Sequence, residues 1–247
     1  MTISPGTSHD PLPGIMKKLR SMKNADSVKG MARYGIRAAK VYGVPMPELR
    51  AMGKEIGKDH LLAERLWKEG VFETRILATL VDDPAEVTPA QMERWVAEFD
   101  NWAVCDGCCN NLFNRTGSAW EKAVDWSARE EEFVKRAGFV LMAVLSVHDK
   151  RAGDDAFLAL LPLCVEGASD ERPMVRKAVN WALRQIGKRN RTLNTESIRT
   201  AKQIRTLGTP SARWIAADAL RELTGAAVRL RLDVRDERKT GRRNRHS

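Results

Sequence analysis

The sequence has few of the features that define membrane, secreted or β-sheet proteins. No stretch of its 247 residues approaches the roughly 18 consecutive apolar residues that span a bilayer. Its first residues, MTISPGTSHDPLPG, lack both the basic start and the apolar run of a signal peptide. Aromatic residues make up only 6% of the chain, and β-branched residues seldom alternate with polar ones. We therefore expect a cytoplasmic protein that has no membrane partner and little or no β-sheet.

Cysteine is also scarce, which argues against disulfides and against a zinc site. Three of the four cysteines lie in the segment DNWAVCDGCC, residues 100–109. A zinc site would need further ligands, but no second cysteine pair exists and His148 stands alone. Cys105, Cys108 and Leu112 recur at i, i+3 and i+7, as core residues of a helix do. We expect buried free thiols, no metal and no cofactor.

Helical spacing of apolar residues dominates the chain. Apolar residues recur at i, i+3, i+4 and i+7 within residues 60–70, 73–83, 88–99, 130–147, 155–168, 172–190 and 211–225. Many of these segments open with proline or a Ser, Thr or Asp cap, and several close with glycine. The pattern predicts an all-α protein of about a dozen short helices. A bundle and a solenoid of helical hairpins both fit, and an echo between residues 64–84 and 170–188 favours the solenoid.

The positive charge of the chain indicates a polyanionic partner. The formal net charge is +10, and residues 229–247 hold eight Arg or Lys against three Asp or Glu, which gives +5. The other half of the excess lies on the rest of the chain. We expect a flexible end over residues 1–12, one helical-repeat domain over residues 13–228, and a basic, disordered tail over residues 229–247.

Trp181 lies on the basic face of an amphipathic helix rather than in its core stripe. Over residues 173–188, the tryptophan lies roughly 140° from the centre of the apolar stripe. The residues at i−4, i+3 and i+7 from it are Lys177, Arg184 and Lys188. Two interpretations stay open. The indole could pack against a neighbouring helix under lysine stems, or it could lie in a groove where cations hold a nucleic-acid backbone.

Two further features are candidates for function: an arginine on an apolar helix stripe, and a tryptophan that shares a helix face with an aspartate. Arg136 shares its direction with apolar Val140, so it needs an anion, either an internal carboxylate or a bound phosphate, whereas Lys135 lies on the polar side. Trp102 and Asp106 are four residues apart and share one face of a helix. This pair could be an indole at a repeat junction beside a capping or paired aspartate, or it could act on a ligand.

Three segments occur in order along this basic helical chain: NWAVCD, FVKRAGFVL and VRKAVNWALRQIGK. Together they resemble the bacterial DNA alkylation repair family, the AlkD-like DNA glycosylases built from HEAT-like helical repeats. The resemblance extends roughly over residues 28–225. It implies an all-α, right-handed superhelical array of HEAT-like helix pairs with a concave basic groove.

The resemblance also implies an activity and the residues that perform it. Trp102, Asp106 and Trp181 match lesion-contacting residues of the family, and Arg136 matches a backbone-contacting arginine, with Lys135 one residue away in the alignment. The basic face around Trp181 adds three DNA-binding candidates: Lys177, Arg184 and Lys188. The implied protein is a monomeric, monofunctional glycosylase that releases cationic purines such as 3-methyladenine or 7-methylguanine from double-stranded DNA without base flipping. The alternative is a non-catalytic DNA-structure-binding or scaffold protein.

Overall fold

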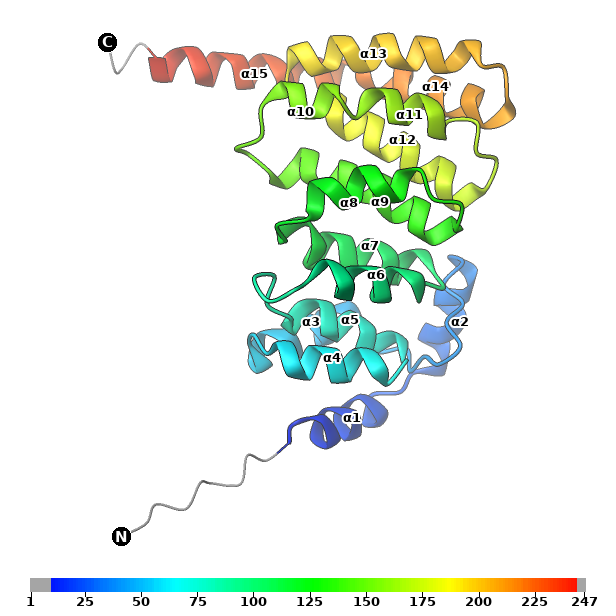
Figure 1. The fold of residues 1–247 in the computed structure, drawn as a ribbon, viewed down its shortest axis with the longest axis vertical. Helices are drawn as coiled ribbons and strands as arrows, with labels where there is room; N and C mark the ends of the chain where they lie inside the picture. The colour runs from blue at the N-terminus through cyan, green and yellow to red at the C-terminus, as the bar shows by residue number, and fades with distance from the viewer. Residues whose placement is uncertain (1–9, 244–247) are drawn as a thin grey trace. The chain divides into compact units, whose positions relative to one another are not determined.

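The computed structural model describes residues 10–243, with side chains through residue 234. These residues form fifteen α-helices and one short 3₁₀ helix, and no strand occurs within them (Figure 1). The prediction of an all-α fold is therefore confirmed. No helix within this range is both long and apolar enough to cross a membrane.

Contacts between Cα atoms divide the chain into two compact units. The first contains residues 10–88 of the described chain and Asp100–Leu112. Its helices are α1 (Leu12–Ser21), α2 (Ala25–Arg33), α3 (Met46–Ile56), α4 (His60–Lys68), α5 (Phe72–Val81) and α7 (Trp102–Asn111). Helix α5 packs against α3, α4 and α7 and buries Ile76 and Leu77. It is thus the central helix of this unit.

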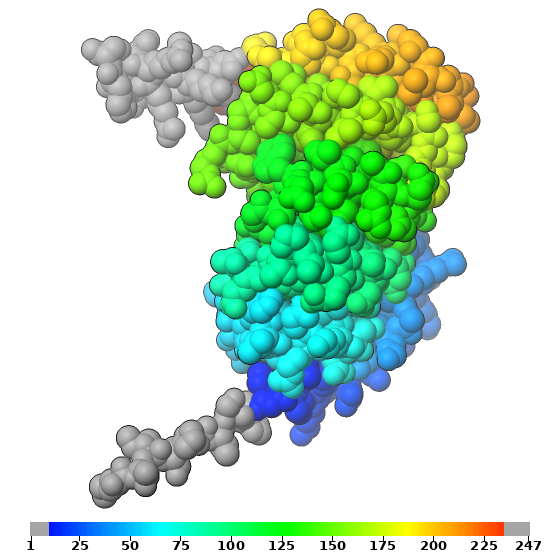
Figure 2. All heavy atoms as spheres, in the orientation of Figure 1, coloured from blue at the N-terminus to red at the C-terminus, as the bar shows by residue number. Residues whose placement is uncertain are grey.

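The second unit contains Pro89–Phe99 and the chain from residue 113 onward. Its helices are α6 (Pro89–Ala97), η1 (Phe113–Arg115), α8 (Ala119–Ser127), α9 (Glu132–His148), α10 (Asp154–Leu158), α11 (Leu161–Gly167), α12 (Pro173–Gly187), α13 (Arg191–Thr206), α14 (Pro210–Leu223) and α15 (Ala226–Arg243). Helix α9 packs against α8 and α12, and α13 packs against α11, α12 and α14. In Figure 2, the lime to yellow atoms of α10, α11 and α13 form one continuous surface. The expected single domain over residues 13–228 stays a prediction.

Most helix boundaries follow the proline and glycine signals in the sequence. Pro173 and Pro210 occupy the first positions of α12 and α14, and the glycines that follow α4 and α13 adopt positive φ. The segment 155–168 differs from our expectation of one helix, because the structure divides it into α10 and α11. Pro162 lies in the first turn of α11, where its missing N–H costs no hydrogen bond, whereas it would break a continuous helix.

The structure describes parts of the two segments that we expected to be flexible. Helix α15 covers most of the segment that we expected to be a disordered tail, through Arg243. Val228 and Leu232 lie one turn apart and are buried where α15 meets α14, and Asp233 forms an ion pair with Arg191 of α13. At the other end, Asp10 forms an ion pair with Arg65. Residues 1–9 and 244–247 lie outside the described residues.

Helices α8 and α9 approach each other so closely that one position must lack a side chain. A Cβ atom at Gly138 would lie 2.4 Å from the backbone nitrogen of Ser127 and 2.8 Å from the carbonyl carbon of Trp126. Real Cβ atoms do not approach backbone atoms this closely, and backbone moves less easily than the end of a side chain. The glycine therefore sets the distance between these two helices.

We expect Gly138→Ala to lower the free energy of unfolding by about 3 kcal/mol, because the new methyl group forces α8 and α9 apart. Urea unfolding followed by circular dichroism measures this. Gly117→Ala is the control, since no atom lies within 4 Å of the added methyl group; its unfolding free energy should change by less than about 0.5 kcal/mol. Wild-type stability in Gly138→Ala would contradict the close approach.

Candidate functional site

Helix α7 in the first unit begins at Trp102 because Asn101 caps it. The Asn101 Oδ1 atom accepts hydrogen bonds from the backbone N–H groups of Ala103 and Val104, each 3.0 Å long. The cap is buried, and its Nδ2 donates to the Asp100 carboxylate at 2.7 Å. Capping by Asn satisfies two otherwise unpaired amides of the first turn. The start of α7, and with it the position of Trp102, is thereby fixed.

Trp102 and Asp106 occupy one face of α7 and are both half-buried. The indole Nε1 of Trp102 donates a hydrogen bond of 2.9 Å to the carbonyl oxygen of Tyr34, in the segment between α2 and α3. The helix itself lies close to α5, because a Cβ at Gly107 would come within 3.1 Å of the Ile76 Cδ1 atom. An indole and a carboxylate thus lie on one face of α7, and both are partly exposed.

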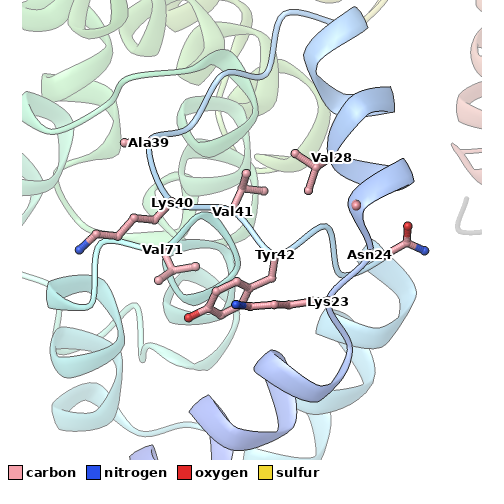
Figure 3. A pocket seen from close by; sticks show the side chains of 9 residues that line it. Lys23, Asn24, Val28, Ala39, Lys40, Val41, Tyr42 and Val71 are labelled. Carbon is pink, nitrogen blue, oxygen red and sulfur yellow. The ribbon is translucent and has the colours of Figure 1, made fainter.

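The first unit also contains a hollow that sequence reasoning missed. It measures about 470 Å³, and Figure 3 shows the amino group of Lys23 over the ring of Tyr42, at 4.8 Å from the ring centroid. Lys40 and the apolar side chains of Val28 and Val71 also line it. No periodic pattern of residues in the sequence predicts this hollow, because its shape depends on how the loop before α3 folds.

A buried carboxylate determines that loop. Glu73 of α5 is fully buried, and its Oε atoms accept hydrogen bonds from the backbone amides of Tyr42 (2.9 Å), Gly43 (2.6 Å) and Val44 (3.2 Å). Three amide donors compensate for the burial of the charge. The partners lie about thirty residues away from Glu73, which leaves no periodic signal for sequence analysis.

In the second unit, Trp181 lies on α12 where the sequence placed it, beside the core stripe and not within it. The indole is half-buried, whereas the five residues of the expected stripe are fully buried: Val175, Val179, Ala182, Leu183 and Ile186. Lys177, one turn before Trp181, is exposed. This part of α12 therefore presents an indole and a lysine outside the core.

The other two cations of this face have internal partners that the sequence did not indicate. Arg184 pairs with Glu222 and, at 3.4 Å, with Asp218, both on α14. Lys188 Nζ lies 2.6 Å from the Glu222 carboxylate. Burial alone would raise the pKa of Glu222, but the hydrogen bond from Lys188 and the charge of Arg184 lower it overall. Much of the expected basic face is thus neutralised by α14.

The structure also gives Arg136 and Lys135 internal contacts. Arg136 is buried, as its direction along the helix predicted, and its Nη1 donates a 2.6 Å hydrogen bond to the carbonyl oxygen of Met174 in the first turn of α12. Lys135 Nζ lies 3.7 Å from the Asp170 carboxylate. Arg136 thereby joins α9 to α12, and its proposed contact with a phosphate stays a prediction.

All four cysteines are buried free thiols, as the sequence predicted. Within the described residues, no group of three or more His, Cys, Asp or Glu side chains is placed to hold a metal ion. Burial, reinforced by Cys105 and Asp82, raises the pKa of Cys108 well above its ordinary value, and burial raises the pKa of Cys164 to about 12.

We expect the native protein to react very slowly with a thiol reagent at pH 8, because a thiol of pKa about 12 is ionised in only about one molecule in 10⁴ and is also shielded from the reagent. Absorbance of the released thiolate measures the reaction. The same protein in urea should react rapidly at all four cysteines. Fast reaction of one native thiol would contradict its burial.

A second prediction concerns the cap of α7. Asn101→Ala should lower the free energy of unfolding by about 1–2 kcal/mol, because two amides of the first turn lose their acceptor. Asn101→Asp keeps an acceptor oxygen and should retain most of the stability. Urea unfolding of the three proteins distinguishes them, and equal losses in both variants would show that the cap is not the stabilising contact.

The structure has a counterpart of similar fold among solved proteins. That protein is described as belonging to a new family related to the HEAT-like repeat DNA glycosylases, with affinity for branched DNA structures. The two chains share 19% sequence identity with a TM-score of 0.69, over 77% of this chain and 81% of the other. The likeness shows the fold, and it confirms the predicted HEAT-like repeat architecture.

Comparison with curated protein sequences finds no match. The family model described as DNA alkylation repair enzyme, however, matches residues 15–223, which is most of the chain. On this match, the chain belongs to the DNA alkylation repair enzyme family.

Proposed function

We propose that the protein is a monofunctional DNA glycosylase that hydrolyses the N-glycosidic bond of cationic alkylated purines, of the 3-methyladenine or 7-methylguanine type, in duplex DNA. The observation that carries the proposal is the Trp102–Asp106 pair, an indole and a carboxylate on one face of α7, both partly exposed. Family membership supports a role in DNA alkylation repair. The proposed protein is a cytoplasmic monomer that needs no cofactor.

The chemistry suits a carboxylate without a metal or a lysine nucleophile. Alkylation makes the purine cationic, so the bond between the sugar C1′ and the base breaks with its electron pair moving to the base, which leaves as a neutral molecule. The sugar then carries positive charge, as in glycoside hydrolysis. Asp106 stabilises that charge and accepts a proton from the water that adds to C1′, and the proton passes to solvent.

The tryptophans would contact DNA through their π faces. Trp102, on the same helix as Asp106, offers an aromatic face to the deoxyribose and its developing cation. Trp181 is a proposed DNA contact of the second unit. The proposal needs no base flipping, because the charge is recognised from the backbone side of a stacked lesion.

The proposed phosphate contacts differ in what they require. Lys177 is exposed and free to meet a phosphate oxygen. Arg184 and Lys188 would have to break their salt bridges with Asp218 and Glu222 before they could bind a phosphate. Arg136 acts by positioning α12.

A second function has a specific observation in its favour. Because α14 neutralises Arg184 and Lys188, the face around Trp181 has fewer free cations than its sequence suggests. A protein that recognises DNA structure without excising bases would need fewer contacts at one nucleotide, and the similar solved structure belongs to proteins with affinity for branched DNA. Base release separates the two functions.

We expect Asp106→Asn to slow the single-turnover release of 7-methylguanine from methylated duplex DNA at least about a hundredfold, because the amide cannot accept the proton or stabilise the sugar cation. Released base is measured by chromatography. Asp155→Asn, which changes an exposed carboxylate on α10, is the matched control and should keep the wild-type rate.

Two outcomes would overturn the proposal. Wild-type base release by a folded Asp106→Asn variant would remove the assigned role of the carboxylate. Absence of release by the wild-type protein would favour the non-catalytic function. Borohydride treatment should trap no covalent protein–DNA adduct, since a lysine Schiff base has no place in this mechanism.

A further inference from the structure

Helices α12 and α14 are joined by a row of polar contacts that repeats every four residues. Asn180 Nδ2 donates to the Asp218 carboxylate at 2.7 Å, Arg184 follows with Asp218 and Glu222, and Lys188 closes the row on Glu222. Two cations of α12 meet two carboxylates of α14 across the helix pair, and Asp218 also pairs with Arg221. The carboxylates of this part of the interface are therefore all paired with cations.

The first position of the same row is built differently. One turn before Asn180 lies Arg176, and one turn before Asp218 lies Trp214, so an indole stands where the next carboxylate of α14 would be. The Arg176 guanidinium carbon lies 5.1 Å from the centroid of the Trp214 ring. The contact is a cation–π interaction, which leaves the positive charge of the arginine uncompensated.

The charge around this contact is positive. Arg176, its neighbour Lys177 and Arg213 form no salt bridge with any of the side chains that the structure describes. The buried Nε–H group of Arg176 also has no hydrogen-bond partner there. Of the carboxylates just before α12, Asp170 pairs with Arg172, whereas Glu171 accepts the Ser211 amide at 3.1 Å and keeps its charge. Three cations therefore stand against one carboxylate without a cationic partner.

Trp214 is moreover 39% exposed, although a tryptophan gains most from burial. A ring that is backed by a guanidinium and open to solvent can take a second flat group on its free surface. A nucleobase supplies the flat group and its phosphate supplies the anion that the surrounding cations lack. An apolar peptide would cover the ring but would leave these charges unpaired.

We propose that Trp214 and Arg176 form a stacking site for one unpaired nucleotide of DNA. This site, Trp214 on Arg176, uses neither Trp181 nor Asp106. It rests on the proposed function only in taking DNA as the ligand. Its role is to bind a single-stranded arm or an unpaired base next to a duplex.

Binding of two DNA probes tests this inference. One is a fully paired undamaged duplex, and the other is the same duplex with an unpaired oligothymidine arm, both labelled for fluorescence anisotropy. Trp214→Ala should weaken binding of the armed duplex about tenfold, which is the usual effect of losing one base–aromatic stack. Binding of the paired duplex should change less than twofold. Trp214→Tyr should restore most of the difference, because a phenol ring also stacks.

Two controls keep the test specific. Leu207→Ala removes another exposed apolar side chain, 41% exposed, and should leave binding of both probes unchanged. Arg176→Gln should weaken the armed duplex in the same direction as Trp214→Ala. Two results would overturn the stacking site. In the first, Trp214→Ala binds each probe as tightly as the wild-type protein does. In the second, the substitution weakens binding of both probes by the same factor.

The result is independent of base excision. Trp214→Ala should release 7-methylguanine from fully paired methylated DNA within twofold of the wild-type rate. If Asp106→Asn keeps the wild-type rate, the glycosylase proposal fails while the binding comparison still decides the stacking site.

Discussion

The close packing of α9 is the constraint on which the second unit depends. Twelve of its seventeen residues are buried, so the helix has almost no solvent face and must be contacted on nearly all sides. Gly138 admits the backbone of α8 on one side, and Arg136 binds the backbone of α12 on another. The orientation of α12 follows from these contacts. Trp181 is displaced from the core stripe of α12 and stays half-buried.

In the second unit, salt bridges within the protein, rather than the net charge, determine which cations are available to a ligand. The chain has a formal charge of +10, yet Arg184 and Lys188 are held by carboxylates of α14. A cation already paired inside the protein gains little from a phosphate, since it must first give up a good partner. Lys177, in contrast, is exposed and forms no salt bridge with the side chains that the structure describes.

The first unit fixes its polar side chains by hydrogen bonds to backbone. Asn101 caps the helix that carries Trp102 and Asp106, the Trp102 indole binds the Tyr34 carbonyl, and Glu73 holds three amides of the loop before α3. Such contacts restrain side chains more firmly than surface ion pairs do, because the backbone partners are themselves held in helices and turns.

The sequence by itself determined the elements whose cause is local. Apolar spacing predicted the helices, the core stripe of α12 and the burial of the cysteines, because a side chain's direction on a helix follows from its position alone. The same reasoning placed Trp102 with Asp106 and set Trp181 apart from the core. It also placed Arg136 on the apolar stripe of α9 with a carboxylate or a phosphate as its partner, but it did not indicate the backbone carbonyl of Met174 that the structure shows.

Only the tertiary structure decided what meets across helices. The neutralisation of Arg184 and Lys188 by α14, the loop amides around Glu73 and the stacking of Trp214 on Arg176 all join residues at least 29 positions apart. The same holds for α15, whose polar sequence is typical of a disordered tail. Val228 and Leu232 are buried where this helix meets α14, and the sequence of α15 alone does not indicate that contact. Long-range pairs of this kind leave no period in the sequence, because the distance between two helices, and not the spacing within one, brings them together.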